Sequence, residues 1–138
     1  MALLDVNALV ALAWDSHVHH ASIRRWFQEH GEQGWATCPV TESGFVRVSS
    51  NPRVLPAAIS INDSLYVLSA MRSQGAHRFL TDDVSPLDED VPRVHGYRQV
   101  TDARLLALAA RNGLSLVTFD AGIPPLAVQG AVELLSAL

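Results

Sequence analysis

Lysine is absent from this sequence of 138 residues, and all ten of its basic residues are arginine. Every mechanism that requires a lysine is therefore excluded, including those of Walker-type phosphate loops, receiver domains and haloacid-dehalogenase-type phosphatases. The net charge of −4 argues against a general nucleic-acid coat protein, which needs a basic face. It does not argue against an enzyme that approaches phosphate groups through metal ions.

Cysteine and long hydrophobic runs are scarce as well. The single cysteine, Cys38, cannot form an internal disulfide and is typical of a reducing compartment. The longest apolar run, Ala8 to Trp14, is far shorter than the roughly 18 residues that a membrane span needs. An acid stands at Asp5 and the first arginine only at Arg24, so the cationic start of a signal peptide is missing. We therefore expect a cytoplasmic protein with no membrane contact.

Charged residues make up 17% of the chain, below the roughly 25% that is typical of soluble domains. The 49% of hydrophobic residues suffices for one core without disulfides or a structural metal, so residues 1–138 are expected to form a single domain. Little charge remains to cover a solitary monomer, and the segment from Ile61 to Met71 carries a long apolar stripe. We expect a partner to cover part of the surface.

The hydrophobic pattern alternates between short strands and longer helices. Strands are predicted at 1–5, 34–38, 77–81, 114–119 and 131–135. Helices are predicted at 8–14, 17–30, 39–50, from 56 or 60 to 75, and at 102–112 with Thr101 as the N-cap. The acidic, proline-containing segment 82–97 is predicted to be a surface loop. This alternation predicts parallel strands joined by helical crossovers, with helices on both faces of the sheet.

Four acids are placed by the predicted elements at one edge of the sheet. Asp5 and Asp120 end or follow strands, Glu42 lies in the first turn of the helix after the second strand, and Asp102 opens the helix after the third. The carboxyl edge of a parallel sheet is where open α/β sheets bind ligands. Each acid alone has an ordinary explanation as a residue favoured by a helix dipole. Four converging carboxylates repel one another, and a hard divalent cation with oxygen ligands compensates for that repulsion. We expect magnesium or manganese at this edge.

Such a site is suited to phosphodiester hydrolysis, because a bound ion can activate water and neutralise charge on the phosphate. Asn7 and Thr118 stand two residues from Asp5 and Asp120, close enough to orient these carboxylates. The alternative roles for Asn7 and Thr118 are a helix cap and an ordinary strand residue.

Several other side chains were weighed as functional groups. The candidates for phosphate contact are Arg24, Arg25, Arg47, Arg53 and Arg98. We favour Arg98 for substrate binding because it stands just upstream of an acid of the predicted site. The histidines at 17, 19 and 20 lack partners at ligand spacing and indicate a solvated helix start. Cys38 is expected to be a core residue, and the pair Asp82-Asp83 has no lysine to complete a receiver site.

Four blocks of the sequence carry a family resemblance. They are DVNAL at 5–9, TESGF at 41–45, QVTDARLLALA at 99–109 and LVTFD at 116–120. In this order they resemble the signature blocks of PIN-domain nucleases. Nearly the whole chain resembles the VapC-type ribonuclease toxins of bacterial toxin–antitoxin pairs.

The resemblance implies a three-layer α/β/α PIN fold around a mostly parallel sheet of about four to five strands. It also implies Mg²⁺- or Mn²⁺-dependent cleavage of RNA, a homodimer, and inhibition by a cognate antitoxin. Carried over by position, Asp5, Glu42, Asp102 and Asp120 would be the catalytic, metal-binding acids, with Asn7 and Thr118 supporting them. Two alternatives stay open: a PIN nuclease of RNA processing or DNA repair outside a toxin pair, and a catalytically idle module that binds RNA or protein.

Overall fold

A five-stranded, entirely parallel sheet with the order β3-β2-β1-β4-β5 forms the centre of the computed structural model, which describes residues 1–128 and 130–137. Its strands are β1 (Ala2–Leu4), β2 (Trp35–Thr37), β3 (His77–Phe79), β4 (Ser115–Thr118) and β5 (Val132–Leu134). The three inner strands are buried on both faces, which explains their continuous apolar runs. The predicted parallel sheet is confirmed.

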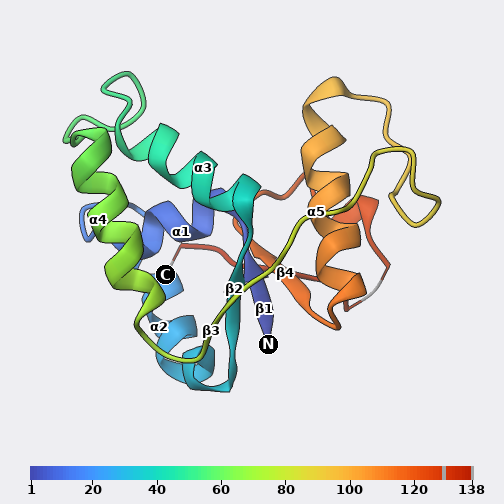
Figure 1. The fold of residues 1–138 in the computed structure, drawn as a ribbon, viewed down its shortest axis with the longest axis horizontal. Coiled ribbons are helices and arrows are strands. Elements are labelled where there is room, and N and C mark those ends of the chain that lie inside the picture. Colours follow the sequence, from blue (N-terminus) through green and yellow to red (C-terminus); the bar gives the residue numbers. More distant parts are fainter. Residues whose placement is uncertain (129, 138) are drawn as a thin grey trace.

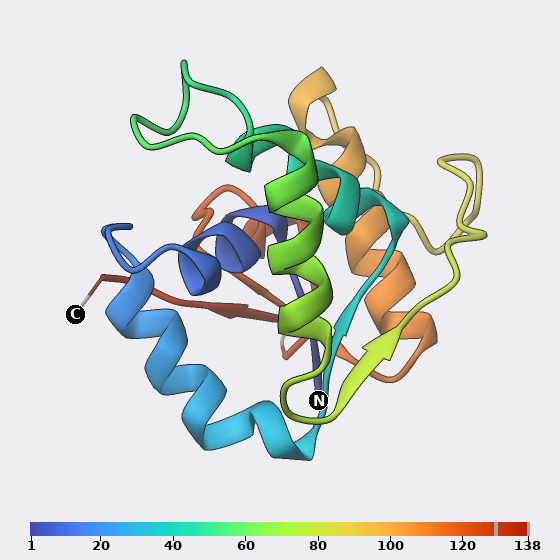
Figure 2. The same cartoon turned by 60° about the vertical axis from the view of Figure 1, so that its left-hand side comes forward.

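Five α-helices cover the two faces of the sheet (Figures 1 and 2). They are α1 (Val6–Ala13), α2 (His20–His30), α3 (Pro39–Ser49), α4 (Ile61–Arg72) and α5 (Val100–Arg111). Helices α1 to α4 share one hydrophobic cluster on one side, and α5 packs in a second cluster on the other. The predicted three-layer architecture is therefore confirmed. Within the described residues, no helix combines the length and apolarity that a membrane crossing requires.

The helix starts differ from the predicted ones where local contacts compete with the helix. Helix α1 begins directly after Asp5, whose carboxylate accepts a hydrogen bond from the N–H of Val6. Helix α2 begins three residues later than predicted, after a turn in which the His17 ring accepts a bond from a backbone N–H. The 3₁₀ turn Tyr97–Gln99 continues into α5, so Thr101 lies inside that helix and does not cap it.

The segment between β3 and α5 contains no helix or strand from residue 82 to 96, as predicted for a surface loop. Two arginines of α5 attach it to the body of the protein. Arg104 pairs with Asp82 at 2.7 Å, and Arg111 pairs with both Asp88 and Asp90. Asp82 is thus an anchor of the loop, and Cys38 is fully buried in the core as expected.

The direction in which successive strands are added to the sheet reverses at β1. The chain proceeds from β1 outward through β2 to β3, and it then crosses the other face of the sheet to place β4 on the opposite side of β1. In open parallel sheets, the ends of the strands at such a reversal form a crevice that binds ligands. The residues that follow β1 and β4 therefore have the position of a ligand-binding site.

Helices α1 and α3 approach each other closely at Gly44. A β-carbon added there would lie 2.5 Å from Cγ2 of Val6, the residue next to Asp5. Val6 is β-branched and has little rotameric freedom to move away. Glycine at position 44 therefore permits the packing that places α3 beside the start of α1.

We predict that Gly44→Ala lowers the free energy of unfolding by about 1–3 kcal/mol, because an added methyl group must displace a rigid neighbour. The control is Gly96→Ala, where the nearest atom belongs to the flexible side chain of Gln99 at 3.4 Å. This control should stay within about 0.5 kcal/mol of the wild type in urea unfolding. Equal stability of both variants would contradict the close packing of α1 and α3.

Candidate active site

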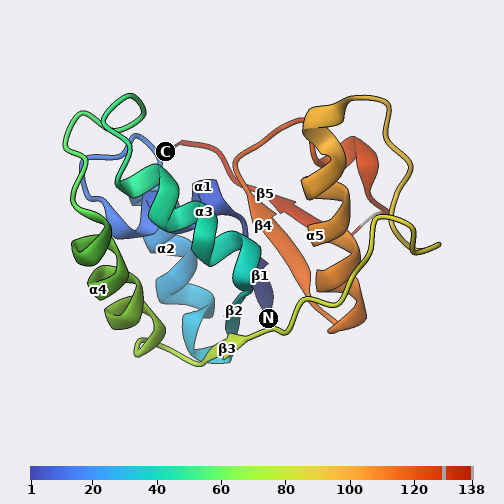
Figure 3. The same ribbon diagram turned by 45° about the horizontal axis from the view of Figure 1, so that its top comes forward.

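The crevice beside the ends of β1 and β4 is a pocket of about 620 Å³. Its polar and charged lining consists of Asp5, Asn7, His17, Arg47, Arg98, Thr101, Asp102 and Asp120. Figure 3 shows α3 and α5, which supply its two walls, on either side of β1 and β4. The structure thus brings together three of the four acids selected from the sequence.

Asp5 is the most deeply placed of these acids, with only 7% of its surface exposed. Its backbone N–H donates to the carbonyl of Val117 in the neighbouring strand at 3.0 Å. Its Oδ1 accepts the N–H of Val6 at 2.8 Å, and its Oδ2 accepts the Thr118 hydroxyl, also at 2.8 Å. Both carboxylate oxygens are therefore held by groups that belong to the ends of β1 and β4.

Thr118 and Asn7 link the acids to one another. The Thr118 hydroxyl, fully buried, accepts a hydrogen bond from the backbone N–H of Asp120 at 3.0 Å. The amide of Asn7 donates to Asp5 Oδ2 at 3.3 Å, and its Oδ1 accepts the backbone N–H of Phe119 at 3.1 Å. The structure thus places Asn7 and Thr118 where they orient Asp5 and the backbone that carries Asp120.

The electrostatics of the crevice disfavour negative charge. Burial raises the pKa of Asp5, against the opposing effect of its hydrogen bonds to Thr118 and Val6. The pKa of Asp102, in the first turn of α5, is raised to about 6 by burial and by the charges of Asp5 and Asp120. The three carboxylates therefore repel one another when all are ionised.

A divalent cation would relieve this repulsion, and carboxylate oxygens are the ligands that Mg²⁺ and Mn²⁺ prefer. In residues 1–128 and 130–137, no three His, Cys, Asp or Glu side chains converge closely enough to form a ready ligand set. An ion here would take its remaining ligands from water and substrate, as Mg²⁺ commonly does. The residues of the crevice fit such an ion.

Glu42 does not belong to this crevice, which corrects the expectation that four acids converge. Its Oε2 accepts the hydroxyl of Thr37 at 2.6 Å, and its Oε1 lies 3.4 Å from Nη1 of Arg72. The same hydroxyl is 2.8 Å from Nε2 of His77 on β3. Glu42 lines a neighbouring, mainly apolar pocket of about 740 Å³ between α3 and α4, and Arg47 lines both pockets.

The helical phase of α3 explains this separation. Val40 and Arg47 line the acidic crevice, and Gly44 on the same face meets α1. At 3.6 residues per turn, position 42 points about 200° away from position 40. The predicted strands place Glu42 at the correct edge of the sheet, but they do not specify the direction of its side chain.

Two residues that line the crevice, Arg47 and His17, are not singled out by the sequence. Arg47 is one of five arginines that the sequence offers for phosphate contact. Its spacing of seven residues from Val40 predicts that both side chains lie on the same face of α3, and both line the crevice. The sequence predicts His17 in a solvated helix start, but it lines the crevice, where burial and the neighbouring His19 and His20 lower its pKa. Nothing in the local sequence indicates this position of His17, because it depends on the turn between α1 and α2.

Comparison with known proteins gives a family match over most of the chain. The model of the PIN domain family matches residues 2–128. Ribonuclease VapC38 of Mycobacterium tuberculosis is 66% identical, and the alignment covers both chains completely. Ribonuclease VapC39 and Ribonuclease VapC44 of the same organism are 48% and 44% identical, covering 97% and 96% of this chain and 99% and 94% of theirs.

We predict that Asp102→Asn stabilises the metal-free protein at neutral pH. The folded-state pKa of about 6 lies above the value of about 3.9 in an unfolded chain, so this carboxyl destabilises the fold increasingly as pH rises from about 4 to about 6. Asp102 is partly buried, and after solvent screening we expect a gain of about 1 kcal/mol at pH 7.5 that vanishes near pH 4.

The measurement is urea unfolding at both pH values in the presence of EDTA. Asp63→Asn serves as the control, because this exposed acid lies in the first turn of α4, where the helix dipole favours its charge. Its replacement should be neutral or slightly destabilising at pH 7.5. A loss of stability in Asp102→Asn at that pH would contradict the clustering of the carboxylates.

Proposed function

This chain belongs to the PIN-domain family and, within it, to the VapC-type proteins, and from that membership we propose that it is an endoribonuclease. The site of RNA phosphodiester hydrolysis would be the crevice of Asp5, Asp102 and Asp120. The observation that carries this proposal is the gathering of three carboxylates at the reversal point of the sheet, where burial and repulsion raise the pKa of Asp102 to about 6. Clustered acids with a raised pKa are typical of catalytic sites. This clustering therefore favours a catalytic role over a binding module without activity.

Asp5, Asp102 and Asp120 are the residues that would hold Mg²⁺ or Mn²⁺. When bound, such an ion supplies an activated water molecule and neutralises charge on the phosphate group. Thr118 and Asn7 would keep the Asp5 carboxylate in one orientation through their hydrogen bonds to Oδ2. Glu42 is left out of this set, because its carboxylate is engaged by Thr37 and Arg72.

We also propose that the chain is a single domain and that it acts in a toxin–antitoxin pair. The family match spans residues 2–128 of 138, which supports one PIN domain over residues 1–138. The three relatives are each named as a VapC ribonuclease, and we infer that this chain acts on cellular RNA in the cytoplasm as the toxin of such a pair.

Exposed apolar surface supports the existence of protein partners. Ile61, Leu65 and Phe79 line the pocket between α3 and α4, and they remain 59%, 48% and 40% exposed. The sequence predicts an apolar stripe on α4, and the structure buries only part of that stripe, including Leu68 and Met71. We propose that a second copy of the chain and an antitoxin cover apolar surface of this kind while the acidic crevices of the dimer stay open.

The catalytic proposal predicts a ranking of acid-to-amide variants. Asp5→Asn and Asp102→Asn should each reduce RNA cleavage by about 100-fold or more while the protein stays folded, because a ligand charge is lost. Asp120→Asn should also reduce cleavage. Glu42→Gln is the matched control at the same edge of the sheet, and it should retain activity within a few-fold. Cleavage is followed on RNA with Mg²⁺ or Mn²⁺, and EDTA should abolish it.

Two results would contradict this assignment. Cleavage that persists in EDTA would remove the metal ion from the proposal. A folded Asp102→Asn protein with wild-type activity, or a Glu42→Gln protein as inactive as Asp5→Asn, would show that the wrong acids were selected.

The toxin proposal predicts a stable complex with the product of a small adjacent gene. Coexpression of both should yield a copurifying assembly that contains a dimer of this chain and in which cleavage is suppressed. Light scattering gives the mass, and the RNA assay gives the activity. A monomer of 15.0 kDa that cleaves RNA and ignores that product would leave a nuclease outside a toxin pair.

A further inference from the structure

We propose that Arg47 and Arg98 form a two-sided phosphate clamp that holds single-stranded RNA across the three carboxylates, with Tyr97 stacking on a neighbouring unpaired base. The inference rests on the proposed ribonuclease function, and it assigns the residues that hold the RNA. Its claim concerns binding, so that it can fail while the cleavage proposal stands.

The two arginines reach the crevice from opposite walls. Arg47 belongs to α3, and Arg98 belongs to the 3₁₀ turn that leads into α5. These two elements lie on either side of β1 and β4 in Figure 3. Both arginines line the pocket that also contains Asp5, Asp102 and Asp120. A chain of phosphates that crosses the carboxylates would therefore meet one guanidinium before them and one after them.

Neither guanidinium is neutralised by a protein carboxylate. The arginine ion pairs within the described ranges involve Arg25, Arg72, Arg104 and Arg111. Arg47 and Arg98 take part in none of these pairs, although three carboxylates line the same pocket. Both side chains are exposed. Their positive charge is therefore available to an incoming phosphate, for which a planar guanidinium offers paired N–H donors.

The overall charge makes such local contacts necessary. The net charge is −4, and three of the acids that contribute to it lie in the crevice, where they repel RNA. Arginines placed at the rims attract the phosphates on either side of the bond to be cleaved without pairing with the acids themselves. Contacts of this kind position the nucleic acid and carry no sequence information.

Tyr97 is the reason why we expect the bound RNA to be single-stranded. Its side chain is 81% exposed, and the Arg98 guanidinium lies 5.6 Å from its ring centre and donates to its hydroxyl at 3.3 Å. An exposed ring beside a phosphate-binding group is a typical stacking platform for a base of single-stranded RNA. Bases in a duplex are already stacked and cannot occupy it.

The test measures RNA binding by fluorescence anisotropy in an Asp102→Asn background, which keeps the RNA intact. Arg47→Gln and Arg98→Gln should each weaken binding of a short single-stranded RNA about tenfold. Each should also reduce the slope of log Kd against log salt by about 0.7, the value for one phosphate contact on a single strand. Arg47→Lys should restore most of that slope because it keeps the charge.

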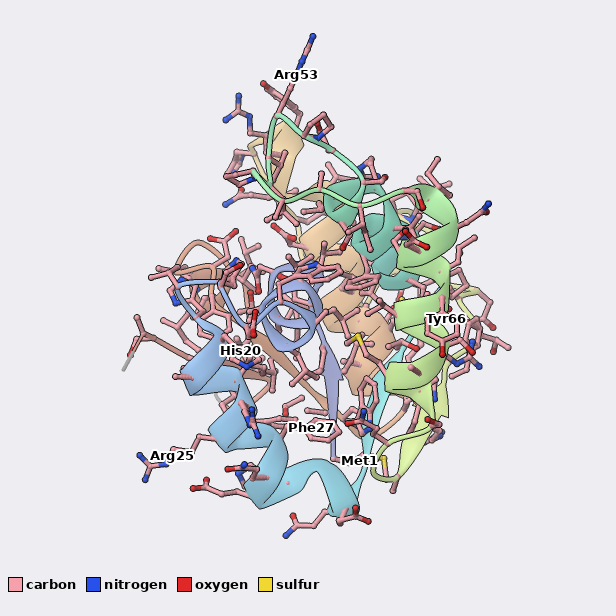
Figure 4. All side chains as sticks on the ribbon, turned by 90° about the vertical axis from the view of Figure 1, so that its left-hand side faces the viewer. Met1, His20, Arg25, Phe27, Arg53 and Tyr66 are labelled. Atoms are coloured by element: carbon pink, nitrogen blue, oxygen red, sulfur yellow. The ribbon has the colours of Figure 1, made fainter. Side chains whose placement is uncertain are left out.

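The control is Arg25→Gln, which removes an equal charge from an arginine of α2 that Figure 4 shows pointing away from the body of the protein. It should leave both the affinity and the salt slope unchanged. Tyr97→Ala should weaken binding of the single strand but not of a duplex of the same sequence, and Tyr97→Trp should retain the preference for the single strand.

Unchanged affinity and salt slope in both glutamine variants would overturn the clamp, as would tighter binding of the duplex than of the single strand. These outcomes are distinct from a failure of the proposed function. In that case the protein without any substitution would not cleave RNA, whatever the arginine variants bind.

Discussion

The hydrogen bond from the Thr118 hydroxyl to Oδ2 of Asp5 joins the ends of the two strands between which the chain order reverses. This junction orders the part of the crevice that lies at the ends of β1 and β4. It fixes the deepest carboxylate, it receives the backbone N–H of Asp120, and it lies beside the amide of Asn7. Because the junction is buried and the strands are paired in parallel, the acids that follow β1 and β4 have one relative placement.

The acids of the loop before α5 and the acids of the crevice lie in opposite electrostatic environments. In the loop before α5, hydrogen bonds from Arg111 lower the pKa of Asp90, and Asp82 is paired with Arg104. In the crevice, Asp5 and Asp102 have raised pKa values and no arginine partner within the described part of the chain. Unrelieved repulsion lowers the stability of the fold. We interpret this repulsion as the consequence of a site whose carboxylates bind a cation and its substrate and not an arginine.

Helix α3 lies between the acidic crevice and the apolar pocket beside α4. One of its faces packs on α1 at Gly44 and presents Arg47 to the acidic crevice. The opposite face carries Glu42 and borders the apolar pocket beside α4. A partner bound in that pocket would touch the same helix that forms a wall of the crevice. Arg47 lines both pockets, so it lies at the boundary between the proposed partner surface and the proposed substrate site.

The sequence alone determined the order of strands and helices, the parallel sheet and its carboxyl edge, because apolar periodicity and helix-stop residues are local signals. It also predicts that Asp5, Asp102 and Asp120, each of which directly follows a strand or opens a helix, lie at that edge, and the structure places all three in one crevice. Only the tertiary structure decided that Glu42 turns away and that His17 and Arg47 turn in. These directions depend on the rotation of α3 and on the path between α1 and α2, which are set by packing against distant residues and not by the neighbours in the chain.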